Sequence, residues 1–212
     1  MKKVLAIGLV SLALAQAKVF IGVQASYDWG ASIGKTNTFN TPIWSGNVTD
    51  GWGVGANFGL EQDFGYFGLR EFLSFDYSSS FLDKATGFYG FDVFDLDLNL
   101  DALINFVKGD MFSMGMFLGA GVGYQYMSFF NNGGANNATK IKFSFGNLPL
   151  FARAGLTFGI GSHSRIDLGL KIPLIAFGLH KGSNGGAAAG GNGDEQYYYP
   201  PLKIQLSYKF LF

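Results

Sequence analysis

The sequence predicts an all-β fold in which eight antiparallel strands close into a transmembrane β-barrel. Three observations predict it: apolar and polar residues alternate in eight separate runs, the links between runs alternate between short and long, and aromatic residues gather near the ends of the runs. Alternation with period two places successive side chains on opposite faces of a strand. A barrel wall with one lipid-facing and one polar face has this pattern.

The eight runs differ in what they place on the polar face. They cover residues 19–28, 52–61, 67–77, 94–105, 112–125, 148–159, 165–172 and 202–212. The first two alternate apolar residues with glycine and polar or acidic residues. The third carries Arg70 on its polar face but places Glu71 on the apolar one, and the fourth alternates Phe and Leu with Asp95, Asp97 and Asp101.

The last four runs complete the barrel and carry most of the cations. The polar face of the fifth run is nearly all glycine, which leaves room for long side chains from other strands. The sixth run carries Arg153, the seventh Lys171, and the eighth Lys203 and Lys209. A closed barrel is expected because hydrocarbon cannot satisfy the backbone of an open strand edge.

The connections predict the orientation of the barrel in its membrane. Short links are expected near residues 62–65, 108–111 and 161–164, and long loops over residues 30–51, 78–92, 128–147 and 176–200. Short periplasmic turns and long extracellular loops are typical of outer-membrane barrels. We therefore expect surface-exposed loops and both termini in the periplasm.

Outward-facing aromatic residues predict two girdles at the membrane interfaces. The extracellular girdle would contain Tyr27, Trp29, Trp52, Phe75, Tyr77, Tyr124 and Tyr126, and the periplasmic girdle Phe67, Phe106, Phe112, Phe158, Phe210 and Phe212. Outer-membrane lipid and lipopolysaccharide are then the expected surroundings. Tyr208, Phe210 and Phe212 form the expected C-terminal signal for the outer-membrane assembly machinery.

Residues 1–17 are predicted to be a cleavable signal peptide, with residues 18–212 as the barrel domain. Lys2 and Lys3 precede an apolar run over residues 4–15, and Ala15-Gln16-Ala17 has the small residues of a cleavage site. The apolar run is shorter than the roughly 20 residues of a membrane-spanning helix. Export through the inner membrane to the outer membrane follows.

The charged residues of the polar face are predicted to form one ion-pair network inside the barrel. Its expected members are Arg70, Asp95, Asp97, Asp101, Arg153, Lys171, Lys203 and Lys209. Asp95 and Asp97 are expected to meet Lys203 or Lys171, and Asp101 to meet Arg70 or Lys209, because the eighth strand stands opposite the fourth in an eight-stranded barrel. No metal is expected, since alternate residues of a strand lie about 7 Å apart and cannot share an ion unaided.

Charge balance, cysteine content and barrel size narrow the class of function. An equal number of Lys+Arg and Asp+Glu residues, 15 of each, gives no basic field for a nucleic-acid partner, and the absence of cysteine excludes disulfides and thiolate metal sites. An eight-stranded barrel is filled by its own side chains. A structural or surface-interaction role is therefore expected, with a narrow gated pore as the alternative and the extracellular ligand left open.

An enzyme and a soluble barrel are less consistent with the sequence. A lipid-modifying barrel enzyme needs a histidine base beside a nucleophile, and the two histidines are expected in a turn, His163, and a loop, His180. Residues 182–193 lack the lysine of a phosphate-binding loop, so a flexible surface loop is expected there and no cofactor. A soluble lipocalin-like barrel would turn its apolar faces inward and would not need two aromatic girdles.

Four segments resemble the Helicobacter-type outer membrane protein family. They are residues 66–77, 101–106, 115–123 and 165–174. The resemblance implies a C-terminal barrel of this size, and large members of the family include host-cell adhesins and porins. Those adhesins carry a large extracellular domain after the first strand, whereas only residues 30–51 separate the first two runs of this chain. No receptor-binding activity is carried over for that reason.

Overall fold

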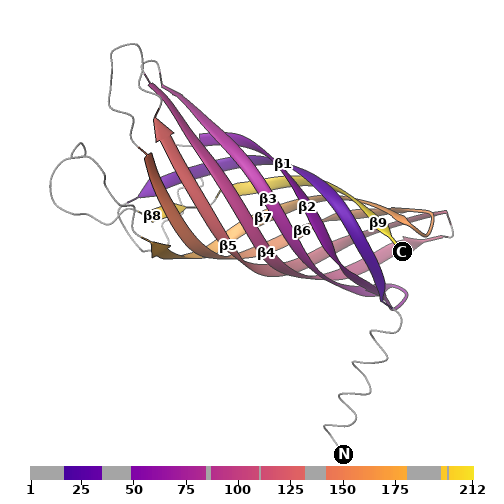
Figure 1. Cartoon of the computed structure of the whole chain (residues 1–212). Helices are drawn as coiled ribbons and strands as arrows, with labels where there is room; N and C mark the ends of the chain where they lie inside the picture. The colour runs from indigo at the N-terminus through magenta and orange to yellow at the C-terminus, as the bar shows by residue number, and fades with distance from the viewer. Residues whose placement is uncertain are drawn as a thin grey trace, which may run out of the picture.

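The described part of the chain forms a closed antiparallel β-barrel with strongly tilted strands (Figure 1). The computed structural model describes residues 17–34, 49–84, 87–109, 111–131, 142–180, 197–199 and 201–212. The strands are β1 Lys18–Gly34, β2 Thr49–Asp63, β3 Phe67–Lys84, β4 Gly87–Lys108, β5 Phe112–Asn131, β6 Lys142–Ile160, β7 Ser164–His180, β8 Tyr197–Tyr199 and β9 Leu202–Leu211. Residues 1–16 of the expected signal peptide and the expected flexible loop at residues 182–193 lie outside the described residues. None of the described residues belongs to a helix long and apolar enough to cross a membrane.

Closure depends on the pairing of the first strand with the last. Neighbours in sequence pair antiparallel from β1 to β7, and β9 pairs with both β7 and β1. The short β8 continues the ladder beyond β9 along the same strand, β1. Trp29 of β1 pairs with Leu202 of β9, and Ser32 of β1 pairs with Tyr199 of β8. Pro201 lies at the break, and proline has no N–H to donate to a ladder. The predicted eight-stranded antiparallel barrel is confirmed, with its last strand interrupted.

The predicted long loop over residues 78–92 is wrong. β3 continues to Lys84 and β4 begins at Gly87, and their ladder is regular up to the pair Lys84 and Gly87. Aromatic and β-branched residues favour strands, and Phe81, Phe88 and Phe91 extend the hairpin. The paired strands of the hairpin satisfy each other's backbone hydrogen bonds whether or not their two faces differ in polarity. The alternation of apolar and polar residues therefore weakens there.

Other predicted loops are also shortened by strand extensions. β1 reaches Gly34, β5 reaches Asn131, and β7 reaches His180, which therefore belongs to a strand and not to a loop. Within the expected loop at residues 176–200, Tyr197–Tyr199 form β8. We call this end of the barrel, at which β1, β3, β5 and β7 finish, the loop end.

The opposite end, here the turn end, carries the three short connections and both ends of the barrel chain. Gly65 and Gly161 adopt positive φ angles of 92° and 62°, which glycine adopts without strain. The Gly65 amide donates to Asp63 Oδ1 at 2.9 Å and tightens the first turn. Lys18 pairs with Glu61 and Phe20 with Leu211, so the first and last strands start and finish together (Figure 1).

The two faces of the wall differ as the alternation predicts. Girdle residues such as Trp52, Phe67 and Phe212 are 73%, 65% and 68% exposed on the outer face. Glu71 is also exposed there, paired in the ladder with Leu60 and Leu100. The polar face is buried inside, which places the candidate site in the lumen.

Candidate functional site

Thirteen charged side chains are buried in the lumen of the described barrel. They are Asp28, Glu61, Arg70, Asp76, Asp95, Asp97, Asp101, Arg153, Arg165, Asp167, Lys171, Lys203 and Lys209, each 9% exposed or less. A buried charge is tolerated only where an opposite charge or several hydrogen bonds compensate for the lost water. The pairing of these groups therefore decides whether the barrel interior is stable.

Arg70 of β3 is the centre of the cluster nearer the turn end. Its Nη2 lies 2.9 Å from Asp101 Oδ2, and its Nη1 lies 2.8 Å from Asp167 Oδ2. Arg153 Nε lies 3.2 Å from Asp101 Oδ1, so one aspartate serves two guanidinium groups. Lys209 pairs with Asp167 and donates to Ser207 Oγ at 2.8 Å. Five strands are joined by these contacts.

Lys171 and Lys203 are the cations of the cluster nearer the loop end. Lys203 Nζ lies 2.7 Å from Asp95 Oδ2 and 3.3 Å from Asp28 Oδ2. Lys171 Nζ lies 2.6 Å from Asp97 Oδ2 and 3.7 Å from Asp95 Oδ2. Each lysine therefore compensates two carboxylates.

This loop-side cluster contains more negative than positive groups. Asp28, Asp76, Asp95 and Asp97 face the two lysines, and Asp76 stands directly opposite Asp95 in the ladder. Like charges in that position repel. Side-chain amides reduce the cost, since Gln125 Nε2 donates to Asp95 Oδ1 at 2.7 Å and Gln24 Nε2 donates to Asp76 Oδ1.

Four phenylalanines form an aromatic layer among these charges. Phe20, Phe72, Phe117 and Phe151 are 3% exposed or less. The Arg153 guanidinium lies 4.8 Å from the Phe72 ring centre, and Lys171 Nζ lies 4.3 Å from that of Phe151. Cations over ring faces gain a further attraction when desolvated. The lumen is thereby filled as well as neutralised.

Glycines on the lumenal face of β5 provide the space that the aspartates of β4 occupy. A Cβ atom on Gly119 would collide with Asp101 Oδ1, and one on Gly123 would collide with Asp97 Oδ1. Gly121 makes the same room for the ring of Phe151, where a Cβ would lie 2.5 Å from two ring carbons. The glycine face of β5 was predicted to leave space for long side chains, and side chains from both neighbouring strands, β4 and β6, occupy that space.

All eight residues of the predicted network lie in this buried lumen. Asp95 meets Lys203, Asp97 meets Lys171 and Asp101 meets Arg70, whereas Lys209 meets Asp167 of β7. Asp167 lies two residues before Gly169 and four before Lys171, on the same polar face of the seventh run. This alternation was the sequence signal that Asp167 faces the lumen. The four lumenal phenylalanines interrupt polar faces in the sequence but had no predicted role.

Three aspartates of the lumen have the spacing of a metal site, but lysines already neutralise part of their charge. Carboxylate oxygens of Asp76, Asp95 and Asp97 lie within 4.8 Å of one another, because Asp76 comes from the strand beside the other two. Spacing along a single strand could not show this. Lys171 and Lys203 contact two of these three carboxylates, so the group belongs to the ion-pair network.

The histidine expected in a turn lies beside a serine. Ser162 Oγ is 2.6 Å from His163 Nδ1 in the exposed β6–β7 turn, and the His163 ring stacks on Phe210 at 5.8 Å. Neighbouring polar side chains commonly contact each other in turns. The geometry therefore describes a turn that packs against the last strand.

The expected C-terminal signal lies on the outer face of β9 at the turn end. Tyr208, Phe210 and Phe212 are 44%, 39% and 68% exposed. Phe210 and Phe212 pack edge to face at 5.1 Å, and Tyr208 Oη lies 3.0 Å from Ser164 Oγ. The Phe212 amide donates to the Val19 carbonyl at 2.9 Å, which fixes the last residue to the first strand.

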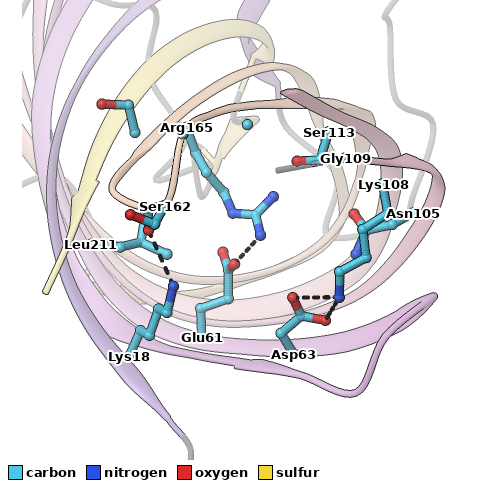
Figure 2. A pocket seen from close by; sticks show the side chains of 13 residues that line it. Lys18, Glu61, Asp63, Asn105, Lys108, Gly109, Ser113, Ser162, Arg165 and Leu211 are labelled. Carbon is cyan, nitrogen blue, oxygen red and sulfur yellow. Dashed lines mark hydrogen bonds and ion pairs between the residues drawn. The ribbon is translucent and has the colours of Figure 1, made fainter. Parts of the chain in front are cut away.

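A cavity of about 190 Å³ opens below the network at the turn end (Figure 2). Its charged lining residues are Lys18, Glu61, Asp63, Lys108 and Arg165. Arg165 Nη2 lies 2.5 Å from Glu61 Oε1, Lys108 Nζ lies 2.8 Å from Asp63 Oδ1, and Lys18 Nζ donates to the Ser162 carbonyl at 3.1 Å. Sequence reasoning did not identify this cavity, because three separate turns form it.

Comparison with known proteins connects this barrel to others. Residues 55–210 match the family model described as Helicobacter outer membrane protein. A comparison with curated proteins gives no match. The crystal structure of Neisserial surface protein A is similar over 92% of this chain and 99% of its own, with 12% identity and a TM-score of 0.51. The attachment invasion locus protein of Yersinia pestis aligns over 92% of this chain and 97% of its own, with 12% identity and a TM-score of 0.37. At 12% identity the likeness to the Neisserial protein is one of fold alone.

Proposed function

Because the chain belongs to the Helicobacter outer membrane protein family and lies in the outer membrane, we propose that it is a barrel with a packed, non-conducting lumen. Its role is then structural or in surface interaction, with the loop end facing the cell exterior. Lipopolysaccharide and outer-membrane lipid would surround its apolar face, and the assembly machinery would read its last strand. The extracellular ligand is not specified by this proposal.

The observation that supports this function is the filling of the lumen by fixed side chains. Arg70 is fully buried between two carboxylates, and the rings of Phe72 and Phe117 lie 5.6 Å and 5.2 Å from its guanidinium carbon. A solute passing this level would have to separate buried ion pairs. Leaving one charge of such a pair buried without its partner typically costs roughly 3 to 5 kcal/mol.

A narrow gated pore is the second candidate, and one observation favours it. Ion pairs form part of the obstruction, and Lys171 already contacts two carboxylates at 2.6 Å and 3.7 Å. A cation with two available partners can move between them without ever being unpaired. Such an exchange would be the gate.

Planar-bilayer recording separates the two candidates. The protein purified from outer membranes is expected to give no single-channel steps at moderate voltage in 1 M KCl. An Arg70→Ala variant, which removes the central cation and its packing, is expected to conduct if it folds. Reproducible steps from the unmodified protein, lost on heating to the unfolded form, would contradict the non-conducting proposal and favour the gated pore.

Surface interaction is tested separately with whole cells. Labelled cells that lack the protein are compared with the parent and with a complemented strain for binding to host-cell surfaces. Lower binding that complementation restores supports an adhesin-like role. Equal binding by all three strains limits the function to a structural one.

A further inference from the structure

The cavity at the turn end contains a buried cation whose hydrogen-bonding capacity is mostly unused. Arg165 is 9% exposed, and its Nη2 is paired with Glu61. Its Nε and Nη1 atoms are buried and have no hydrogen-bond partner among the described residues. Buried donors without partners are uncommon and costly, so this arrangement points to an acceptor that enters from outside the chain.

The remaining charges of the cavity leave it positive. Glu61 is paired with Arg165, and Asp63 holds Lys108 through both of its oxygens at 2.8 Å and 2.9 Å. Lys18, which also lines the cavity, contacts a backbone carbonyl and brings a charge that no lining carboxylate pairs within the described residues. Arg165 of β7 and Lys18 of β1 line the same space, and only β9 lies between their two strands (Figure 2).

The wall beside Arg165 is kept open by a glycine. Gly159 pairs with Arg165 in the ladder, and a Cβ atom there would lie 3.7 Å from Arg165 Nη1 and would collide with Ser113 Oγ. Ser113 lines the cavity and offers a hydroxyl donor next to the guanidinium. The volume of about 190 Å³ far exceeds the roughly 10–15 Å³ that one buried water needs.

We propose that this cavity is a binding site for a small oxyanion of the phosphate or carboxylate type. Arg165 Nη1 donates to one of its oxygens, Ser113 Oγ adds a neutral donor, and Lys18 balances its charge. Guanidinium groups form their strongest hydrogen bonds with such oxyanions. The site lies at the opposite end of the barrel from the loops and requires no conduction, so it is independent of the proposed surface role.

The proposal is tested by titrating anions against the whole protein in a non-ionic detergent without phosphate in its headgroup. Side-chain Nε–H signals of ¹⁵N-arginine-labelled protein report directly on Arg165. Inorganic phosphate and acetate are expected to shift one arginine signal saturably, with chloride at equal ionic strength as the background. A short-chain phosphatidylglycerol, added below its micellar concentration, distinguishes a lipid headgroup from free phosphate as the source.

Three variants make the result specific to the site. Arg165→Gln is expected to weaken binding about ten-fold or more, as the loss of a charge-assisted hydrogen bond implies. Arg165→Lys can keep the ion pair with Glu61 and so protects folding, but it removes the Nη1 donor and should weaken binding similarly. Glu61→Gln removes the competing carboxylate and should tighten binding several-fold.

A cation at the other end of the barrel provides the matched control. Lys142 begins β6 at the loop end. Lys142→Gln changes the net charge by the same amount as Arg165→Gln, and it should leave binding unchanged because Lys142 is far from the cavity. Equal weakening by Lys142→Gln and Arg165→Gln would show only a general charge effect and would overturn the proposal. A linear, unsaturated shift of all arginine signals in the unmodified protein would overturn it as well.

Discussion

Two lysines compensate four carboxylates in the loop-side cluster, and this imbalance governs the effect of single substitutions there. Lys203 contacts Asp95 and Asp28, and Lys171 contacts Asp97 and Asp95. Loss of one lysine leaves several buried negative charges close together. Loss of one aspartate leaves both lysines with a partner, so the two kinds of substitution should differ in cost.

We predict that Lys203→Met lowers the free energy of unfolding by roughly 3 to 5 kcal/mol, because it isolates buried carboxylates. The urea midpoint of the refolded barrel measures this change. Asp97→Asn should cost clearly less, and adding Asp95→Leu to Lys203→Met should restore part of the loss. Lys108→Met is the control, since the pair with Asp63 is 41% and 39% exposed and such pairs contribute little. Similar losses for both lysine variants would refute the importance of burial.

Glycines of the lumenal wall leave room that neighbouring side chains occupy, so substitutions there should also depend on position. We predict that Gly119→Ala lowers stability by about 1 to 3 kcal/mol, since its Cβ would lie 2.5 Å from the Leu100 carbonyl and would collide with the Asp101 side chain. Gly109→Ala is the matched control, because its closest contact would be the Phe112 carbonyl at 3.3 Å. Unfolding midpoints of the two variants should separate clearly. A stability for Gly119→Ala equal to that of the parent would mean that β4 and β5 can move apart.

At the scale of elements, β9 has two tasks that can be separated. It closes the barrel by pairing with β1 and β7, and its exposed outward aromatic residues are predicted to be recognised during insertion. Phe212 itself contributes one backbone hydrogen bond, from its amide to the Val19 carbonyl, and a ring contact with Phe210. Its contribution to closure is therefore small.

Deletion of Phe212 is predicted to reduce the amount of protein in the outer membrane while changing the stability of the refolded barrel little. Immunoblots of membrane fractions at normal expression measure the first effect, and urea unfolding of refolded protein measures the second. Phe75→Ala, which removes an exposed outer ring far from the C-terminus, serves as the control. An unchanged membrane level for the deletion would argue against recognition of the last residue.

For the whole molecule, closure predicts a heat-dependent change in gel mobility. A closed hydrogen-bonded barrel has no free edge at which detergent can begin to open it. Unboiled protein from the outer-membrane fraction should migrate differently from boiled protein, and N-terminal sequencing should begin at Lys18. A first residue other than Lys18 would refute the predicted cleavage after Ala17, and identical mobility of the two samples would be inconsistent with a closed barrel.

The sequence by itself determined the wall of this barrel, because the alternation of side chains between two faces is a local property of a strand. It showed that Asp95, Asp97 and Lys203 face inward and that Trp52 and Phe212 face outward. It failed for residues 78–92, where the strands of an extended hairpin support each other without a two-faced pattern.

The sequence predicted Lys203 or Lys171 as partners of Asp95 and Asp97, and only the tertiary structure decided between the alternatives and added partners that were not predicted. Lys209 contacts Asp167 on the neighbouring strand, while Lys171 reaches across to Asp97, and Asp76 comes beside Asp95 through the register of β3 and β4. The cavity around Arg165 likewise needs three turns brought to one end. Pairings of this kind depend on the tilt and stagger of closed strands, which relate residues far apart in the chain and leave no local pattern.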